Sequence, residues 1–186
     1  MARSADRERG SAILEFLLAG IPLIFLQLVI VEVCLGLWSY HTLAAAIEDG
    51  ALYASTKGQG CTYSGNSCRV SISGIVQDIL GAGVGIDPNQ LNLTFHSSAS
   101  AYYSDIVCNP AQTCLSGTYT TTFWPPARVS SGPPAVYGNM PEISYFDITG
   151  TYPSPVPVIS LFVPAQLLPS IGSLQFSATS RQVVQF

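Results

Sequence analysis

Charged side chains are scarce in this chain. Only 10% of its 186 residues are Asp, Glu, Lys or Arg, whereas about 25% is usual for a soluble domain. Beyond Tyr40, four basic residues face seven acidic ones, so this part carries a net negative charge. A protein whose main partner is nucleic acid presents a basic surface. The amount and the sign of the charge therefore argue against that class.

Patterns typical of metal and phosphate chemistry are also missing from the sequence. The two histidines, His41 and His96, lie at no ligand spacing from a cysteine. The alternating glycines of Gly81–Gly85 lack the lysine of a phosphate-binding loop and predict a turn. His96, Asp105 and a serine could be named as a catalytic set, but nothing in the sequence fixes their geometry. We expect no enzymatic activity, no cofactor and no metal.

Apolar residues, by contrast, are abundant: they make up 48% of the chain, and the mean hydropathy is +0.37. From Ser11 to Ile47 the only formal charges are Glu15 and Glu32. This run is far longer than the roughly 20 residues that a spanning helix needs. It is also longer than the apolar core of a cleaved secretory signal. The sequence predicts one membrane span, at about residues 14–38.

Residues 1–10 precede the apolar run and contain three arginines against two acids. Because basic flanks stay in the cytoplasm, we expect the N-terminus inside and the C-terminal part outside. In a bacterium this is a single-pass inner-membrane protein with a periplasmic domain. Helical spacing continues beyond the interfacial aromatics Trp38 and Tyr40. We therefore predict a leader at 1–10, a helix at 11–56 that Pro22 bends, and a domain at 57–186.

The junction between leader and apolar run places one acid, Glu15, just inside the predicted span. A charged residue at the bilayer centre costs about 2.5–3.5 kcal/mol on insertion scales, and less near the interface. An acid in this place usually has a partner. The alternative is an ordinary anchor whose glutamate reaches the cytoplasmic interface.

The five cysteines indicate the compartment. Cys34 lies in the apolar run and is interpreted as a small packing residue. The other four form two close pairs, Cys61 with Cys68 and Cys108 with Cys114. Four cysteines can pair in three ways, but local pairing needs the least chain closure, and two disulfides are favoured in an oxidising periplasm. A zinc site is the rival, although neither spacing is the usual C-x2-C.

The region after Cys68 predicts an α+β domain with an antiparallel sheet of about four strands. A helix is expected at Val70–Leu80, before the glycines. Alternation predicts four strands, with the third in either phase: Leu91, Leu93 and Phe95; Tyr119, Thr121 and Phe123; Ile143–Gly150; and Leu174–Val184.

Three other stretches of this region are expected to lack strands. Residues 98–118 and 125–141 are rich in Ser, Gly and Pro and are predicted to be loops. The apolar segment Pro157–Leu168 is too short to span a bilayer. It is either a core helix or a patch on the membrane or on a neighbouring subunit.

Several of these residues together resemble a known family. The pattern RG-x4-EF, with Gly10, Glu15 and Phe16, resembles type IV pilin-like proteins. Pro22 follows, and then a segment of the form A-x-x-DGA-x-x-A runs from Ala46 to Ala54. This arrangement resembles the TadE-like pseudopilins of the tight-adherence (Tad) pilus system. Two closing segments, Ser144–Ile159 and Ser177–Arg181, also resemble the family.

The resemblance implies a function. A prepilin peptidase would cut after Gly10, so that Ser11 becomes the N-terminus, and Glu15 and Phe16 would take part in assembly. The protein would be a minor pseudopilin that contributes to pilus biogenesis, adhesion and biofilm formation. Its partners would be the peptidase, other pilins and pseudopilins, the inner-membrane assembly platform and membrane lipid. The alternative is a signal-anchored periplasmic binding or adhesion module that does not enter a pilus.

Overall fold

The structure is a computed structural model that describes residues 3–58, 61–63, 65–98, 104–125, 145–153 and 175–183. The segment Pro157–Leu168 and the predicted loop at 126–141 lie outside these residues. The chain divides into two units, and the described part of the first is the helix up to Leu37. The second unit begins at Trp38 and contains the folded domain.

One long helix, α1 (Arg3–Thr56), accounts for almost a third of the chain. It ends where the predicted helix ends, but it begins at Arg3, inside the predicted leader. Pro22 lies within it, and the helix continues on both sides. The boundary expected at Gly10 is a matter of processing rather than of helix geometry, and it stays a prediction.

The domain contains a four-stranded antiparallel sheet in the order β4-β3-β5-β6. Its strands are β3 (Asn92–Ser97), β4 (Ile106–Cys108), β5 (Tyr145–Pro153) and β6 (Gln175–Val183). A second sheet is a short hairpin of β1 (Thr62–Tyr63) and β2 (Asn66–Ser67). The predicted fold class, a long apolar helix followed by a small α+β domain with four antiparallel strands, is confirmed.

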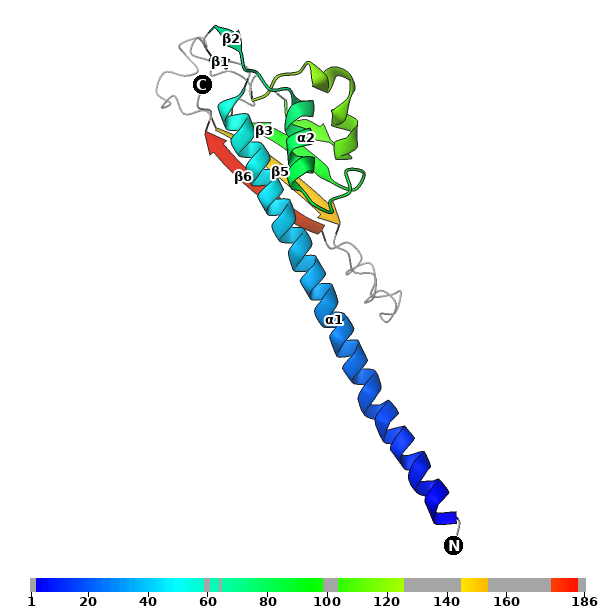
Figure 1. The fold of residues 1–186 in the computed structure, drawn as a ribbon. Coiled ribbons are helices and arrows are strands. Elements are labelled where there is room, and N and C mark those ends of the chain that lie inside the picture. Colours follow the sequence, from blue (N-terminus) through cyan, green and yellow to red (C-terminus); the bar gives the residue numbers. More distant parts are fainter. Residues whose placement is uncertain are drawn as a thin grey trace. The chain divides into compact units, whose positions relative to one another are not determined.

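Both helices of the domain, the end of α1 and α2 (Ile72–Ala82), cover one face of the sheet (Figure 1). The Ser71 hydroxyl begins α2 by accepting a hydrogen bond from the Gly74 backbone N–H at 3.2 Å. The core lies between these helices and the inward side chains of the sheet. It includes Leu43 and Ile47 of α1, Ile72, Ile75, Val76 and Ile79 of α2, and Leu93, Phe95, Phe146, Ile148 and Ala178 of the sheet.

The phase of β5, which the sequence left open, is settled by this core. Phe146, Ile148 and Gly150 face inward, and the Trp124 ring contacts the rings of Phe95 and Phe146 at centroid distances of 5.1 and 4.8 Å. The alternate residues of β5 therefore form the outer face of the sheet.

The strand predicted around Tyr119, Thr121 and Phe123 is wrong. Residues Gly117–Thr120 form a 3-10 helix, η2, and Phe123 makes only an isolated bridge to Ser71. The Thr121 and Thr122 hydroxyls both donate to the Thr118 carbonyl, at 3.0 and 2.9 Å. Such local side-chain bonds offer the backbone an alternative to a strand ladder.

The fourth strand lies instead in a stretch that was predicted to be a loop. Ile106–Cys108 form β4, which pairs with Leu93–Phe95 of β3. A second 3-10 helix, η1 (Ala111–Leu115), follows it. Only three residues of β4 are paired, which is too few for alternation to reveal a strand.

Candidate functional site

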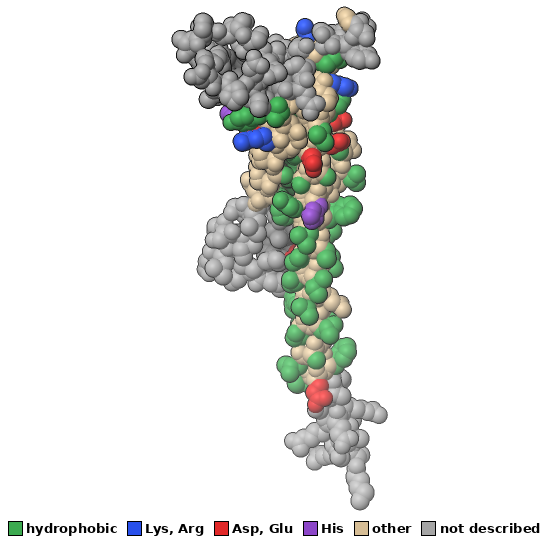
Figure 2. All heavy atoms as spheres, turned by 90° about the vertical axis from the view of Figure 1, so that its left-hand side faces the viewer, with side chains coloured by type: hydrophobic (Ala, Val, Ile, Leu, Met, Phe, Trp, Pro, Cys, Tyr) green, Lys and Arg blue, Asp and Glu red, His purple; other side chains and the backbone are tan. Residues whose placement is uncertain are grey.

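The apolar part of α1 is the first candidate site. Among the described residues, one helix is long and apolar enough to cross a membrane, Leu14–Thr56, and 6% of its most apolar 18-residue segment is buried. Large hydrophobic side chains are exposed from Leu14 to Tyr40, and Figure 2 shows such side chains along the helix. This surface is compatible with a single-pass membrane anchor.

The predicted processing and assembly residues lie at the start of this surface. Gly10 and Ser11 are consecutive residues of α1. Glu15 is exposed, and Phe16 is 76% exposed. One turn beyond Phe16, a methyl group added at Gly20 would meet only the Phe16 ring, at 3.9 Å. The structure therefore places Glu15 and Phe16 on an accessible surface of the helix.

Two other polar side chains of this helix differ in environment. Glu32, the second acid of the apolar run, is only 6% exposed. Cys34, which was interpreted as a packing residue, is a free and exposed thiol. Any packing by Cys34 is therefore against the surroundings of the helix, such as lipid or another subunit.

A second candidate site is the contact between α1 and the folded domain. Small side chains of α1 recur here at intervals of four residues, Ala46, Gly50 and Ala54, and all are buried. A methyl group built on Gly50 would overlap Cγ1 of Ile79 in α2. On the sheet, a methyl group at Gly150 would lie 2.7 Å from Cδ1 of Ile47. The A-x-x-DGA-x-x-A segment is thus the surface through which α1 packs on the domain.

The two acids of this segment point away from the core. Glu48 and Asp49 are exposed, and Asp49 lies near Asp78 of α2. Burial raises the pKa of the Asp78 carboxyl, Asp49 raises it further, and Lys57 lowers it. Because the folded-state pKa of Asp78 is raised, ionisation of this carboxyl lowers the free energy of unfolding. The loss is absent below the pKa that Asp78 has in the unfolded chain, and it grows as the pH rises above that value.

Replacing Gly50 with alanine should lower the free energy of unfolding by about 1–3 kcal/mol, the usual cost of overpacking a core. The added methyl must displace Ile79, and this outweighs the roughly 0.5–1 kcal/mol that alanine gains in a helix. Gly81→Ala is the matched control, because Gly81 is helical and its added methyl meets nothing within 4 Å. Denaturant unfolding of both variants tests this, and equal stability of the two would contradict the packing argument.

Both predicted disulfides are formed in the structure. Cys61–Cys68 closes the β1–β2 hairpin just after α1, where the Val70 N–H donates to the Lys57 carbonyl at 2.7 Å. Cys108–Cys114 joins β4 to η1. Both sulfurs of this second bridge are buried in the core, so it links the short edge strand to the segment that packs on α2.

His96 and Asp105, named in the sequence as possible catalytic residues, do meet in the structure. The His96 Nδ1 and an Asp105 carboxylate oxygen are 2.7 Å apart, and both side chains are more than a third exposed. They lie on the outer face of the sheet in solvent. Among the described residues, no group of three or more His, Cys, Asp or Glu side chains could hold a metal.

Comparison with known proteins agrees with the pattern of this helix. Residues 10–52 match the model of the family described as TadE-like protein. The matched segment begins at Gly10, includes Glu15 and Pro22, and extends through Gly50 of the contact with the domain. The resemblance seen in the sequence is confirmed over this segment. No curated protein and no solved structure matches the chain.

Proposed function

We propose that this protein is a minor pseudopilin of the Tad pilus assembly apparatus. The observation that carries the proposal is the position of the family match, which starts at Gly10 and covers the whole apolar run from Ser11 to Ile47. The protein is then an inner-membrane protein, with its N-terminus in the cytoplasm and its domain in the periplasm. It contributes to pilus biogenesis and, through the pilus, to adhesion and biofilm formation.

Processing gives the junction its chemistry. A prepilin peptidase cuts after Gly10 and leaves a cationic amine on Ser11. Within an assembly, the Glu15 carboxylate of an adjacent subunit neutralises this amine. A pair of opposite charges away from water is tolerable only when both partners are present. The exposed position of Glu15 on α1 fits such a contact between subunits.

The domain has a structural role in this proposal. The family matched by residues 10–52 is in general non-enzymatic, and we expect no catalytic activity here. The partners are the peptidase, other pilins and pseudopilins, the assembly platform and membrane lipid. The disulfide loops lie beyond the matched residues, so the family match assigns them no role.

Replacing Gly10 with valine should abolish cleavage, because the peptidase would meet a branched side chain at the scissile position. The variant is expressed with its peptidase, and the intact mass shows whether the ten-residue leader is retained. Gly20→Val is the matched control: Gly20 lies in the same helix, and its added methyl would meet only the Phe16 ring. Cleavage of the Gly10 variant at the wild-type rate would refute processing after Gly10.

A further inference from the structure

Four side chains form one row across the outer face of the sheet. His96 of β3 is in register with Asp147 of β5, which is in register with Arg181 of β6. Asp105, just before β4, completes the row through its contact with His96. From β4 to β6 the row reads acid, base, acid, base.

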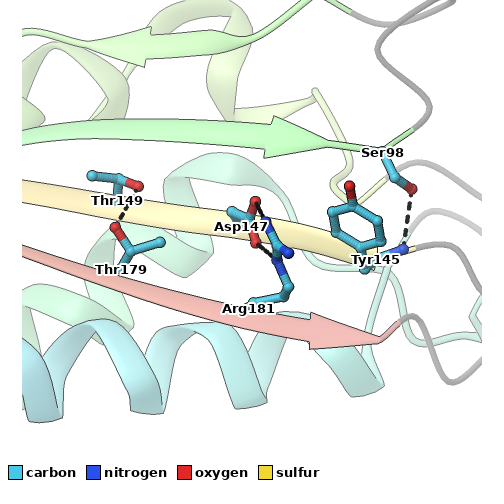
Figure 3. Close-up of polar contacts among 6 residues, drawn as sticks. All are labelled: Ser98, Tyr145, Asp147, Thr149, Thr179 and Arg181. Atoms are coloured by element: carbon cyan, nitrogen blue, oxygen red, sulfur yellow. Dashed lines mark hydrogen bonds and ion pairs between the residues drawn. The ribbon is translucent and has the colours of Figure 1, made fainter.

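The row is held within the subunit by the Arg181–Asp147 ion pair and by the contact between His96 and Asp105. Arg181 donates to both carboxylate oxygens of Asp147, from Nε at 2.6 Å and from the terminal nitrogen at 2.9 Å (Figure 3). Its guanidinium also lies 4.5 Å from the Tyr145 ring centroid. The Arg181 side chain is nevertheless 64% exposed, against 12% for Asp147. Arg181 therefore has donors left for an acid outside the subunit.

On one side of the charged row, the next two rows across β3, β5 and β6 are uncharged and made of short side chains, whereas Tyr145 and Val183 lie in the row on the other side. Thr94, Thr149 and Thr179 lie in register across β3, β5 and β6, as do Asn92, Thr151 and Ser177. The hydroxyls of Thr149 and Thr179 are 2.9 Å apart (Figure 3). Short side chains leave a flat surface that another sheet can approach to about 10 Å, the usual separation of packed sheets.

We propose that this outer face binds the same face of a second copy of the chain. A two-fold axis parallel to the strands, running between β3 and β5, places β6 of one copy over β4 of the other. The reversed row reads base, acid, base, acid, so every side chain meets one of opposite character. Arg181 then faces Asp105 of the other copy, and His96 faces Asp147. The row is self-complementary, as an isologous interface requires.

The same symmetry keeps both chains in one orientation. An axis parallel to the strands leaves the strand direction unchanged in both copies. Within the domain, residues 38–56 of α1 run nearly along β6 (Figure 1), so these segments also point the same way. Two chains anchored in one membrane need this arrangement. This point depends on the proposed membrane anchor, whereas the charge pattern does not.

Charge reversal at the ends of the row tests the interface. In Arg181→Glu, two acids face each other at both ends of the pair, and in Asp105→Arg two bases do. Each variant alone should dimerise more than about tenfold more weakly than the wild type, since like charges in an interface are strongly unfavourable. In a mixture of the two variants, the glutamate introduced at position 181 faces the arginine introduced at position 105, and the other end keeps a native Arg–Asp pair. The mixed dimer should form with near wild-type affinity.

The measurement is native mass spectrometry of the full-length chain in detergent micelles, which separates the mixed dimer from the two self-dimers by mass. Arg69→Glu, the same change on an exposed residue outside the sheet, should leave dimerisation intact. Recovery in the mixture shows that each variant is folded and that the two positions meet across the interface. The proposal is overturned if the wild type is monomeric, or if the mixture of the two variants forms no mixed dimer. It is also overturned if either variant alone dimerises as well as the wild type, because another surface such as α1 then holds the pair.

Discussion

A Glu15→Ala variant should still be cleaved after Gly10, yet cells that carry it as their only copy should make few or no pili. The carboxylate is proposed to neutralise the Ser11 amine of a neighbouring subunit away from water. Removing one partner of such a pair costs about 3–5 kcal/mol, which lowers an assembly equilibrium by more than about 100-fold. Pili counted by electron microscopy and the mass of the processed protein give the two readings.

Glu48→Ala provides the matched control for this experiment. Glu48 is also an exposed acid of α1, but it lies beyond the apolar run, in the segment that packs on the domain, and it points away from the core. Its loss should leave both cleavage and pilus number unchanged. Normal piliation in Glu15→Ala would show that this acid does not register the subunits. Loss of cleavage would move the role of Glu15 to recognition by the peptidase.

Removing the Cys108–Cys114 bridge by Cys108→Ala with Cys114→Ala should lower the free energy of unfolding by about 2–4 kcal/mol. The bridge restricts the unfolded chain, and in the folded state it holds the short strand β4 to η1. Both sulfurs are also buried in the core, so their loss leaves space among packed side chains and adds to the cost. Denaturant unfolding of the oxidised full-length protein measures the change.

The other bridge serves as an internal comparison. Cys61–Cys68 closes a loop of nearly the same length, with a sequence separation of 7 against 6. The chain-entropy contribution of the two bridges is therefore similar. The hairpin that Cys61–Cys68 closes lies next to the end of α1, outside the main sheet, so Cys61→Ala with Cys68→Ala should cost less. A larger loss from the hairpin bridge would contradict the assigned role of β4 and η1.

Features set by local sequence could be predicted for this chain. The long apolar run gave α1, and alternation gave β3, β5 and β6, because these strands present a regular inward face. Local pairing of the cysteines was also predictable, since each pair closes a short loop. The match over residues 10–52 agrees with the residues that carried the resemblance.

Features that depend on distant partners could not be predicted. β4 is a strand only because β3 pairs with it and Cys114 holds it. The segment around Thr118 is a 3-10 helix because threonine hydroxyls bond to nearby carbonyls. The close contact between Gly50 and Ile79 requires the packing of two helices.

The charged row on the outer face is a further case. Asp147 and Arg181 are far in the sequence from each other and from His96 and Asp105, and only the register of the sheet brings the four side chains into line. The sequence suggested His96 and Asp105 only as possible catalytic residues, not as part of an interface. A one-residue change of register would place the row on the opposite face, so no pattern in the sequence alone could reveal it.

The most direct test of the proposed function is the N-terminal sequence of the wild-type protein isolated from the membrane of cells that contain the pilus system. A pseudopilin cut after Gly10 begins with Ser11-Ala12-Ile13-Leu14-Glu15. A chain that still begins with the leader at Met1, or that is cut at any other bond, would contradict the account.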